Sequence, residues 1–195
     1  MEGMLAPLDA AARQKLVDAM RQIRRSLERP RRTGHVAFRR PQPGDIGWII
    51  HRQGLLYHRA YGWDQSFEAL VAQILGKIMA EFDPARDDGW IAEMNESIVG
   101  SIFLTRSDDP AIAKLRLLYV EPEARGHGIG AKLVNGCIER ARELGYRQLT
   151  LWTNDILLSA RRIYQAAGFR LIAQERHHSF GHNLVGQTWI LDLPG

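Results

Sequence analysis

The sequence predicts an α/β fold in which a mixed sheet carries helices on both of its faces. Two segments with apolar residues at helical spacing come before a series of short apolar segments, and a glycine-rich turn joins one of these to a further helix. At 195 residues, with 45% hydrophobic and 25% charged residues, the chain has the composition of a globular protein and the length for one large core. These observations favour one main domain preceded by a separate N-terminal helix.

The first 40 residues carry the excess positive charge of the chain. They hold ten Lys and Arg against four Asp and Glu, whereas the rest of the chain holds sixteen against eighteen. Apolar residues recur at helical spacing from Leu8 to Leu27. We therefore expect an amphipathic helix that Asp9 caps, that continues to about Glu28 and that Pro30 ends.

We expect this basic helix and its linker to occupy residues 1–32, and the main domain residues 33–195. A basic arm can bind nucleic acid, but this one lacks a reading motif and interleaved aromatic residues, so a solvated helix face is the favoured interpretation. The helix must still cover its apolar side, on the main domain or on another chain. A second copy of the chain is one candidate partner.

The main domain is expected to open with one strand and two helices. His35–Arg39 fits a short strand that ends at the turn-forming sequence Pro-Gln-Pro-Gly. Asp45 can cap a helix that continues to about His58 with isoleucines on its buried side. Ser66 can cap the next helix, in which apolar residues from Phe67 to Phe82 recur at helical spacing.

A hairpin, a third strand and a long helix are expected next. Gly89–Met94 and Ile98–Thr105 fit two strands, and the sequence Asn-Glu-Ser between them fits a hairpin turn. Lys114–Val120 is an apolar strand, and a helix follows from about Gly128 to Leu144.

The chain is expected to close with a strand, a helix and two more strands. Gln148–Thr153 fits the strand, and Leu157–Ala167 fits a helix that Gly168 ends. Arg170–His177 and Gln187–Leu193 fit the last two strands. This order of elements predicts the mixed sheet with helices on both faces.

The segment that is most informative about function is the turn Arg125-Gly126-His127-Gly128-Ile129-Gly130. Glycines between a strand and a helix let an anion approach the backbone, where free N–H groups and the helix dipole stabilise negative charge. The spacing fits neither a P-loop nor the glycine pattern of dinucleotide folds. Taken alone, a diphosphate site and a tight turn without a ligand are equally good interpretations.

Two motifs resemble a known family. The pattern Arg-x-x-Gly-x-Gly after a strand ending in Val-x-Pro resembles the acyl-CoA signature of the GNAT superfamily of N-acetyltransferases, and Ala160–Phe169 is similar to its second signature. The resemblance covers roughly residues 33–195. It implies the GNAT fold, acetyl-CoA as co-substrate without a metal, and transfer of acetyl to a primary amine of a small molecule by direct attack.

A second resemblance concerns the N-terminal part. Residues 5–30 and Asp45–Trp63 look like proteins in which a MarR-type winged-helix regulator is fused to a GNAT domain, with nearly all of the winged helix missing here. An ordinary N-terminal extension is the alternative. Either way the chain has no recognisable DNA-reading helix, so we expect no DNA binding by this chain alone.

The resemblance implies roles for individual residues. The amide of Leu118 would polarise the acetyl group, and Tyr164 would protonate the departing thiolate. Asn154 would bond the pantetheine amides or cap the next helix. A position where many members have Asn is Leu157 here, which puts one cofactor contact in doubt. The implied cofactor-binding residues are Leu118, Tyr119, Val120, Arg125, Gly126, His127, Gly128, Ile129, Gly130, Ala131, Asn154 and Tyr164.

The acceptor site is less defined. Strand alternation places Arg116 on the face of Leu118, where a guanidinium would favour an acceptor with a carboxylate, although an ion pair within the sheet is equally plausible. The aromatic residues Tyr57, Tyr61 and Trp63, together with Phe180, are expected to form pocket walls.

The general base is also open. Some family members have a base at the position of Lys114, which cannot accept a proton while it is charged. The candidates are Glu81, Asp83, Glu121, His177, His178 and His182. Neighbouring residues on a strand point to opposite faces, so metal binding by the adjacent histidines is not expected.

Two other functions compete with small-molecule acetylation. One is acetylation of protein lysines or N-termini, which a broad open groove would favour. The other is a weakly catalytic acyl-CoA sensor linked to transcriptional regulation, which the basic helix and the missing base favour. The single cysteine, Cys137, fits an inert buried thiol. With no apolar run long enough for a bilayer span or a signal peptide, we expect a cytoplasmic protein without membrane contact.

Overall fold

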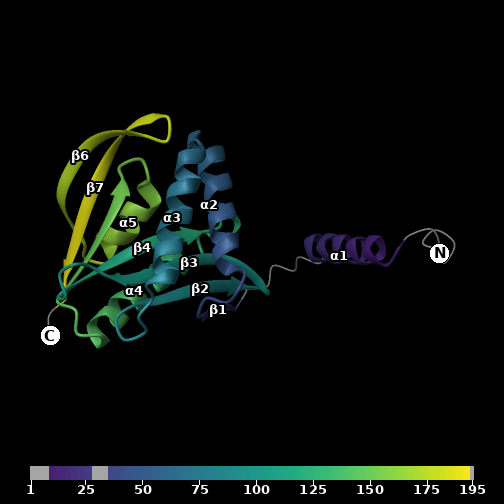
Figure 1. Ribbon diagram of the computed structural model, residues 1–195, viewed down its shortest axis with the longest axis horizontal. Coiled ribbons are helices and arrows are strands. Elements are labelled where there is room, and N and C mark those ends of the chain that lie inside the picture. The colour runs from purple at the N-terminus through teal and green to yellow at the C-terminus, as the bar shows by residue number, and fades with distance from the viewer. Residues whose placement is uncertain (1–8, 28–34, 194–195) are drawn as a thin grey trace. The chain divides into compact units, whose positions relative to one another are not determined.

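A computed structural model describes residues 9–27 and 35–193, and the chain divides into two units, residues 1–35 and 36–195 (Figure 1). The first unit contains α1, Ala10–Leu27. Asp9 caps it as predicted, because its Oδ1 accepts a hydrogen bond of 2.7 Å from the Ala12 N–H. The predicted basic linker lies outside the described residues. None of the described helices is both long and apolar enough to cross a bilayer.

The second unit is built on a seven-stranded sheet with the strand order β1-β2-β3-β4-β5-β7-β6 (Figure 1). Neighbouring strands are antiparallel except β4 and β5, which are parallel. The predicted mixed, mostly antiparallel sheet is therefore confirmed. The strands are β1 Val36–Arg39, β2 Asp88–Met94, β3 Ser97–Arg106, β4 Ile112–Val120, β5 Gln148–Asn154, β6 Arg170–Ser179 and β7 His182–Asp192.

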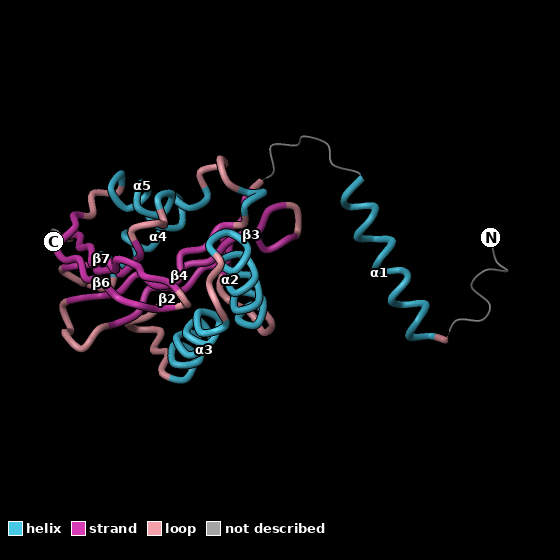
Figure 2. The backbone as a smooth tube through the Cα atoms, turned by 90° about the horizontal axis from the view of Figure 1, so that it is seen from above, coloured by secondary structure: helices cyan, strands magenta, loops and turns pink. Residues whose placement is uncertain are grey.

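Helices cover both faces of the sheet, as predicted. Figure 2 shows α4, Ile129–Glu143, and α5, Leu158–Ala166, on one face, with α2, Asp45–Tyr61, and α3, Gln65–Ala80, on the other. A short 3-10 helix, η2, Pro122–Ala124, connects β4 to the glycine turn. One apolar core lies on the α4 and α5 face, and a second lies on the α2 and α3 face.

Two helix caps differ from the prediction. Asp45 lies in the first turn of α2, and Gly44 is the N-cap. The Asp45 carboxylate instead accepts hydrogen bonds of 2.6 Å from Arg39 and from the Gln42 N–H, which fixes β1 to the start of α2. Asp64, not Ser66, caps α3, because its Oδ1 accepts from the Ser66 N–H at 2.9 Å.

The last two strands are longer than predicted and meet in a tight turn. Ser179 pairs with His182, and Phe180 and Gly181 between them have φ of 59° and 78°. Such a two-residue turn suits the twist of a hairpin. The sequence lacks the Asn-Gly or Asp-Gly that usually indicates this turn, which is why the predicted final strand began only at Gln187.

The centre of the sheet is open and irregular. β4 pairs with β5 only from Ile112↔Gln148 to Lys114↔Thr150, and then the two strands diverge. In the same stretch β4 carries a bulge, since two residues, Leu117 and Leu118, lie opposite one residue of β3. Leu117 has φ of 53° at this bulge. The divergence leaves one edge of β4 without a strand beside it beyond Lys114, so its amides there are available to a ligand.

Candidate active site

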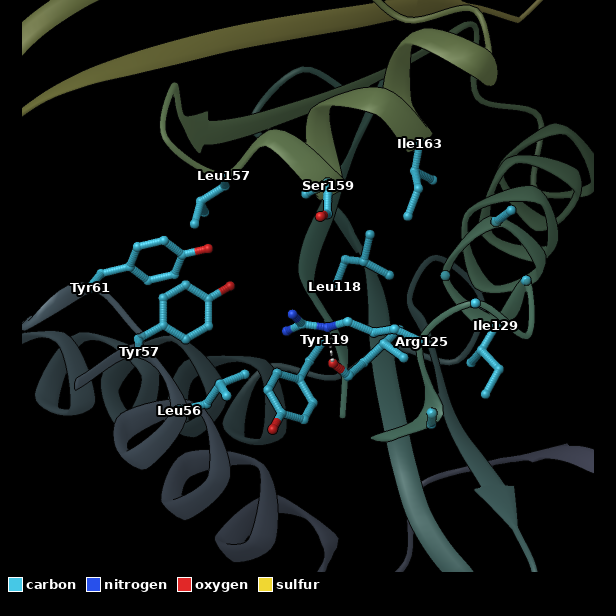
Figure 3. Close-up of a pocket in the computed structure, with 17 residues that line it drawn as sticks. Leu56, Tyr57, Tyr61, Leu118, Tyr119, Arg125, Ile129, Leu157, Ser159 and Ile163 are labelled. Carbon is cyan, nitrogen blue, oxygen red and sulfur yellow. Dashed lines mark hydrogen bonds between the residues drawn. The ribbon is translucent and has the colours of Figure 1, made fainter. Parts of the chain in front are cut away.

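A cavity of about 370 Å³ lies beside the free edge of β4 (Figure 3). It is bordered by α2 on one face of the sheet and by the glycine turn, α4 and α5 on the other. The cavity thus lies where β4 and β5 have diverged. Its lining residues are Leu56, Tyr57, Tyr61, Leu118, Tyr119, Val120, Ala124, Arg125, Gly126, Gly128, Ile129, Gly130, Ala131, Leu157, Ser159, Ala160 and Ile163.

The glycine turn forms an anion-binding cradle at the start of α4. Gly126 and Gly128 have φ of 84° and 72°, and a Cβ at either position would meet no atom within 4 Å. The N–H groups of the first turn of α4, from Ile129 to Ala131, have no partner within the helix and border the cavity. Backbone conformation and open space therefore fit the phosphate groups of coenzyme A.

The segment that leads into the cradle is held to α2 by an ion pair and to β3 by a hydrogen bond. Arg52 of α2 holds Glu121 through hydrogen bonds of 2.5 and 2.8 Å, and the Glu121 N–H donates to the Val99 carbonyl at 2.8 Å. Arg125 Nε bonds the Val120 carbonyl at 3.3 Å, while its guanidinium points across the cavity toward Tyr57 (Figure 3). His127 is exposed and does not line the cavity.

Three of the predicted cofactor residues on β4 line the cavity. Leu118 and Val120 pack against the core on the α4 and α5 face. The Tyr119 ring packs edge-on against Trp48 of α2, on the other face of the sheet. Leu118 thus lies at the free edge of β4, where an exposed amide could polarise an acetyl oxygen.

Tyr164 lies behind the cavity wall that its own helix forms. Its side chain is buried, its ring is 5.9 Å from that of Phe169, and its helix neighbours Ala160 and Ile163 line the cavity. Burial, and to a smaller degree the nearby Tyr57, raises the pKa of the Tyr164 phenol well above its ordinary value. The phenol therefore keeps its proton at neutral pH, as a general acid must.

Asn154 and the neighbouring position Leu157 differ in their access to the cavity. Asn154 is buried, and its Oδ1 lies 2.9 Å from His177 Nε2. It does not line the cavity, and the predicted capping role is wrong because Leu157 is the N-cap of α5. Leu157 itself lines the cavity with an apolar side chain where many relatives in the resembled family have Asn.

Of the predicted pocket walls, Tyr57 and Tyr61 line the cavity. Trp63 and Phe180 are buried, with ring centroids 4.7 Å apart, in a separate apolar cluster behind it. Their large apolar area is better covered there than at an open wall. Tyr57 lies one helical turn before Tyr61, and Figure 3 shows both hydroxyls pointing into the cavity. Burial raises the pKa of Tyr57 to about 12.

Arg116 does not share a face with Leu118, which corrects the prediction from strand alternation. The bulge inserts one residue, so that Leu117 packs with the core on the α2 and α3 face and Leu118 with the opposite core. Arg116 lines a second hollow together with Ile74 and Ile78 of α3. No ion pair or hydrogen bond among the described residues includes Arg116, so the predicted ion pair is not formed there.

None of the six candidate bases lines the cavity. Glu121 is held by Arg52, and Glu81 and Asp83 lie at the far end of α3. His177 lies between Asn154 and Ser179, with each ring nitrogen 2.9 Å from one of them. His178 bonds Asn183, and His182 Nε2 lies 3.1 Å from the Gly62 carbonyl. In the described part of the chain, no three His, Cys, Asp or Glu residues are grouped as for a metal ion.

The divergent strand pair and the glycine cradle enclose one cavity along the edge of β4, an arrangement that suits a long phosphorylated ligand. The acetyltransferase (GNAT) family model matches residues 53–169, and the chain belongs to this family.

Similar proteins agree with this assignment. Human N-acetyltransferase 8B is 39% identical over 93 residues, which are 46% of this chain and 41% of the human protein. The N-acetylaspartate synthetase of Xenopus tropicalis is 26% identical over 89 residues, 46% of this chain and 33% of that protein. This chain therefore matches less than half the length of either. The structure of yncA from Salmonella typhimurium, solved with its cofactor acetyl-CoA, has a TM-score of 0.63 at 20% identity and covers 83% of this chain and 95% of that chain.

Proposed function

We propose that this chain transfers acetyl from acetyl-CoA to the primary amine of a small molecule. The observation that carries the proposal is the cavity beside Leu118, which has the phosphate cradle at one side and the Tyr164 helix at another. The backbone N–H groups from Gly126 to Ala131 and the Arg125 guanidinium would hold the pyrophosphate. The thioester would then lie along the free edge of β4.

The reaction we propose is a direct displacement. The neutral amine attacks the thioester carbonyl carbon, a C–N bond forms and the C–S bond breaks. The amine's proton passes to water, because no candidate base among the described residues lines the cavity. Tyr164 gives its phenolic proton to the departing thiolate, and the Leu118 amide stabilises the negative charge on the carbonyl oxygen.

A small acceptor is favoured over a protein by what surrounds the α2 side of the cavity. The Asp64 N–H donates to the Phe180 carbonyl at 3.2 Å, so the β6–β7 hairpin is bonded to the α2–α3 loop. The aromatic cluster of Trp63, Phe67 and Phe180 fills the space between these segments. We infer that an extended peptide has little room on this side.

We also propose that the acceptor carries a carboxylate. The support is the unpaired Arg116 on β4, and one relative, N-acetylaspartate synthetase, is named for a product that contains carboxylates. A cytoplasmic location, a homodimer and a kinship with MarR–GNAT fusions remain predictions from the sequence.

The first test is a Tyr164→Phe variant. It should bind acetyl-CoA as tightly as the parent chain, while its turnover with an accepted amine falls about 100-fold, as is typical for loss of a general acid. Calorimetry measures binding, and release of free thiol together with mass spectrometry of the product measures turnover. Tyr146→Phe is a matched control, because Tyr146 is also buried but bonds the Arg86 carbonyl away from the cavity. Equal turnover of parent and Tyr164→Phe would remove Tyr164 from the mechanism.

The sensor is the second candidate, and the lack of a candidate base at the cavity favours it. A sensor would bind acetyl-CoA tightly in calorimetry but release thiol no faster when any member of a broad amine panel is added. Acetylated product from even one amine, at a rate that depends on Tyr164, would instead support the enzyme.

A further inference from the structure

A second hollow, of about 240 Å³, lies on the α2 and α3 face of the sheet, and it shares no lining residue with the cavity. Strand β4 joins the two, because it supplies Lys114 and Arg116 to the hollow and Leu118 to the cavity. The other lining residues of the hollow come from α3 and its C-cap, from β3 and from segments next to β2 and β3: Ile74, Lys77, Ile78, Glu81, Asp87, Thr105, Arg106, Ser107 and Asp108.

The Arg116 guanidinium is half-buried in this hollow without a partner among the described residues. Burial lowers the pKa of Arg116, and no nearby carboxylate offsets this. Four other half-buried arginines hold a carboxylate, Arg39 with Asp45, Arg52 with Glu121, Arg106 with Asp87 and Arg140 with Asp88, whereas Arg86 and Arg161 bond backbone carbonyls. A half-buried guanidinium loses part of its hydration, and no carboxylate compensates for this at Arg116, so a bound anion would stabilise it.

The other charges of the hollow leave room for an anion at Arg116. Asp87 is neutralised by Arg106 at 2.6 Å. Glu81 and Asp108 are exposed, and neither forms an ion pair with Arg116. Lys114, on the same strand, adds a second positive charge beside Arg116. The two charged residues that β4 itself supplies to the hollow, Lys114 and Arg116, are both cationic.

The hollow and the cavity lie along the same strand. Arg116 precedes Leu118 by two residues on β4, with the bulge at Leu117 between them. Arg116 is also close to Lys114, where the pairing of β4 with β5 ends. An acceptor with its amine at Leu118 and its anionic group at Arg116 would lie along β4, with its carbon chain against the half-buried Leu117.

We propose that Arg116, with Lys114 beside it, is the carboxylate subsite of the acceptor, so that the substrates are amino acids or other small amines with a carboxylate. A guanidinium suits this role because its N–H groups bind a carboxylate in a bidentate manner. The inference rests on the proposed acetyl transfer, but it concerns a different group of residues from those that hold acetyl-CoA.

The test uses acceptors in matched sets with acetyl-CoA and the full chain. One set is phenylalanine, phenylalaninamide and phenethylamine; another is β-alanine, β-alaninamide and ethylamine. The carboxylate member should have a kcat/KM about 100-fold above that of its partners, as expected for a desolvated charge pair. Arg116→Met should remove this advantage while leaving the rate with the uncharged partners and the Kd for acetyl-CoA unchanged. Arg116→Lys should retain part of it.

Arg142→Met is the matched control, since Arg142 is exposed in the last turn of α4 and lines neither hollow. It should behave like the parent chain. A thermal unfolding curve for each variant shows that the protein is folded.

Binding of product-like ligands separates the subsite from the activity. In the presence of coenzyme A, N-acetylphenylalanine should bind more tightly than N-acetylphenethylamine, and Arg116→Met should abolish the difference. The subsite proposal would be overturned if amines were acetylated equally well with and without a carboxylate, or if the preference survived Arg116→Met. The proposed acetyltransferase activity would still stand in either case. Arg116-dependent binding without acetylation of any amine would overturn the acetyltransferase alone. If neither acetylation nor such binding occurs, both proposals fall.

Discussion

Single glycines decide whether the turn before α4 can hold phosphate. Gly126 and Gly128 have left-handed φ and open space around them, whereas a Cβ at Gly130 would lie 2.7 Å from Ile163 Cδ1. The first two are therefore required for backbone conformation, and Gly130 for the close approach of α4 and α5. Gly136, in the middle of α4, has open space and no such φ.

This contrast gives a prediction with an internal control. Gly126→Ala should lower the free energy of unfolding by about 1–2 kcal/mol, because alanine is strained at positive φ. It should also weaken acetyl-CoA binding at least about tenfold by displacing the N–H groups of the cradle. Gly136→Ala should leave binding unchanged and raise stability by up to about 1 kcal/mol, since alanine favours the helix. Urea unfolding and calorimetry check both, and equal cofactor affinity in the two variants would contradict the role of the cradle.

The residues near the turn also show what the sequence could predict. The cofactor residues on the turn were found because their motif is local, and all of them except His127 line the cavity. The face of Arg116 could not be found, since the bulge at Leu117 depends on how β3 and β4 pair, and strict alternation gives the wrong side. Trp63 and Phe180 were misplaced because their mutual packing joins segments far apart in the chain.

Elements were predicted well where they carry their own periodic pattern. The four helices and seven strands of the main domain occur in the expected order, with most boundaries within a few residues. The β6–β7 hairpin is the exception. It is long, and it contacts the α2–α3 loop through the Phe180 ring, the Phe180 carbonyl and His182. We infer that this contact shapes the acceptor side of the cavity.

A pair of substitutions tests the hairpin. Phe180→Asn deletes the buried ring, but Asn tolerates the positive φ of the turn. Phe180→Ala deletes the ring and also places a residue there that tolerates positive φ poorly. Both should lower the free energy of unfolding by about 3 kcal/mol or more through loss of the ring, with Ala the more destabilised. Both should raise the KM for the acceptor and leave the Kd for acetyl-CoA unchanged. An unchanged acceptor KM in both variants would show that the hairpin does not border the acceptor.

At the scale of the whole molecule, the two units differ in what stabilises them. In the described residues, the apolar clusters of the second unit draw only on residues 36–193. In α1 the side chains of Leu16, Val17, Met20 and Ile23 are 38%, 41%, 62% and 58% exposed. A helix with an exposed apolar side and a basic opposite side needs a partner to be stable. The sequence indicated this helix from its periodicity, but it could not indicate what covers it.

Removing residues 1–35 should therefore leave a folded and active second unit. Its thermal midpoint should stay within about 2 °C of that of the full chain, and its Kd for acetyl-CoA within about twofold, because none of the removed residues that the structure describes belongs to the core or the cradle. If a second copy covers α1, the full chain should elute as a dimer in size-exclusion chromatography with light scattering. Met20→Ser and the truncated chain should then both be monomers. A truncated chain that no longer unfolds cooperatively would show instead that α1 covers part of its own second unit.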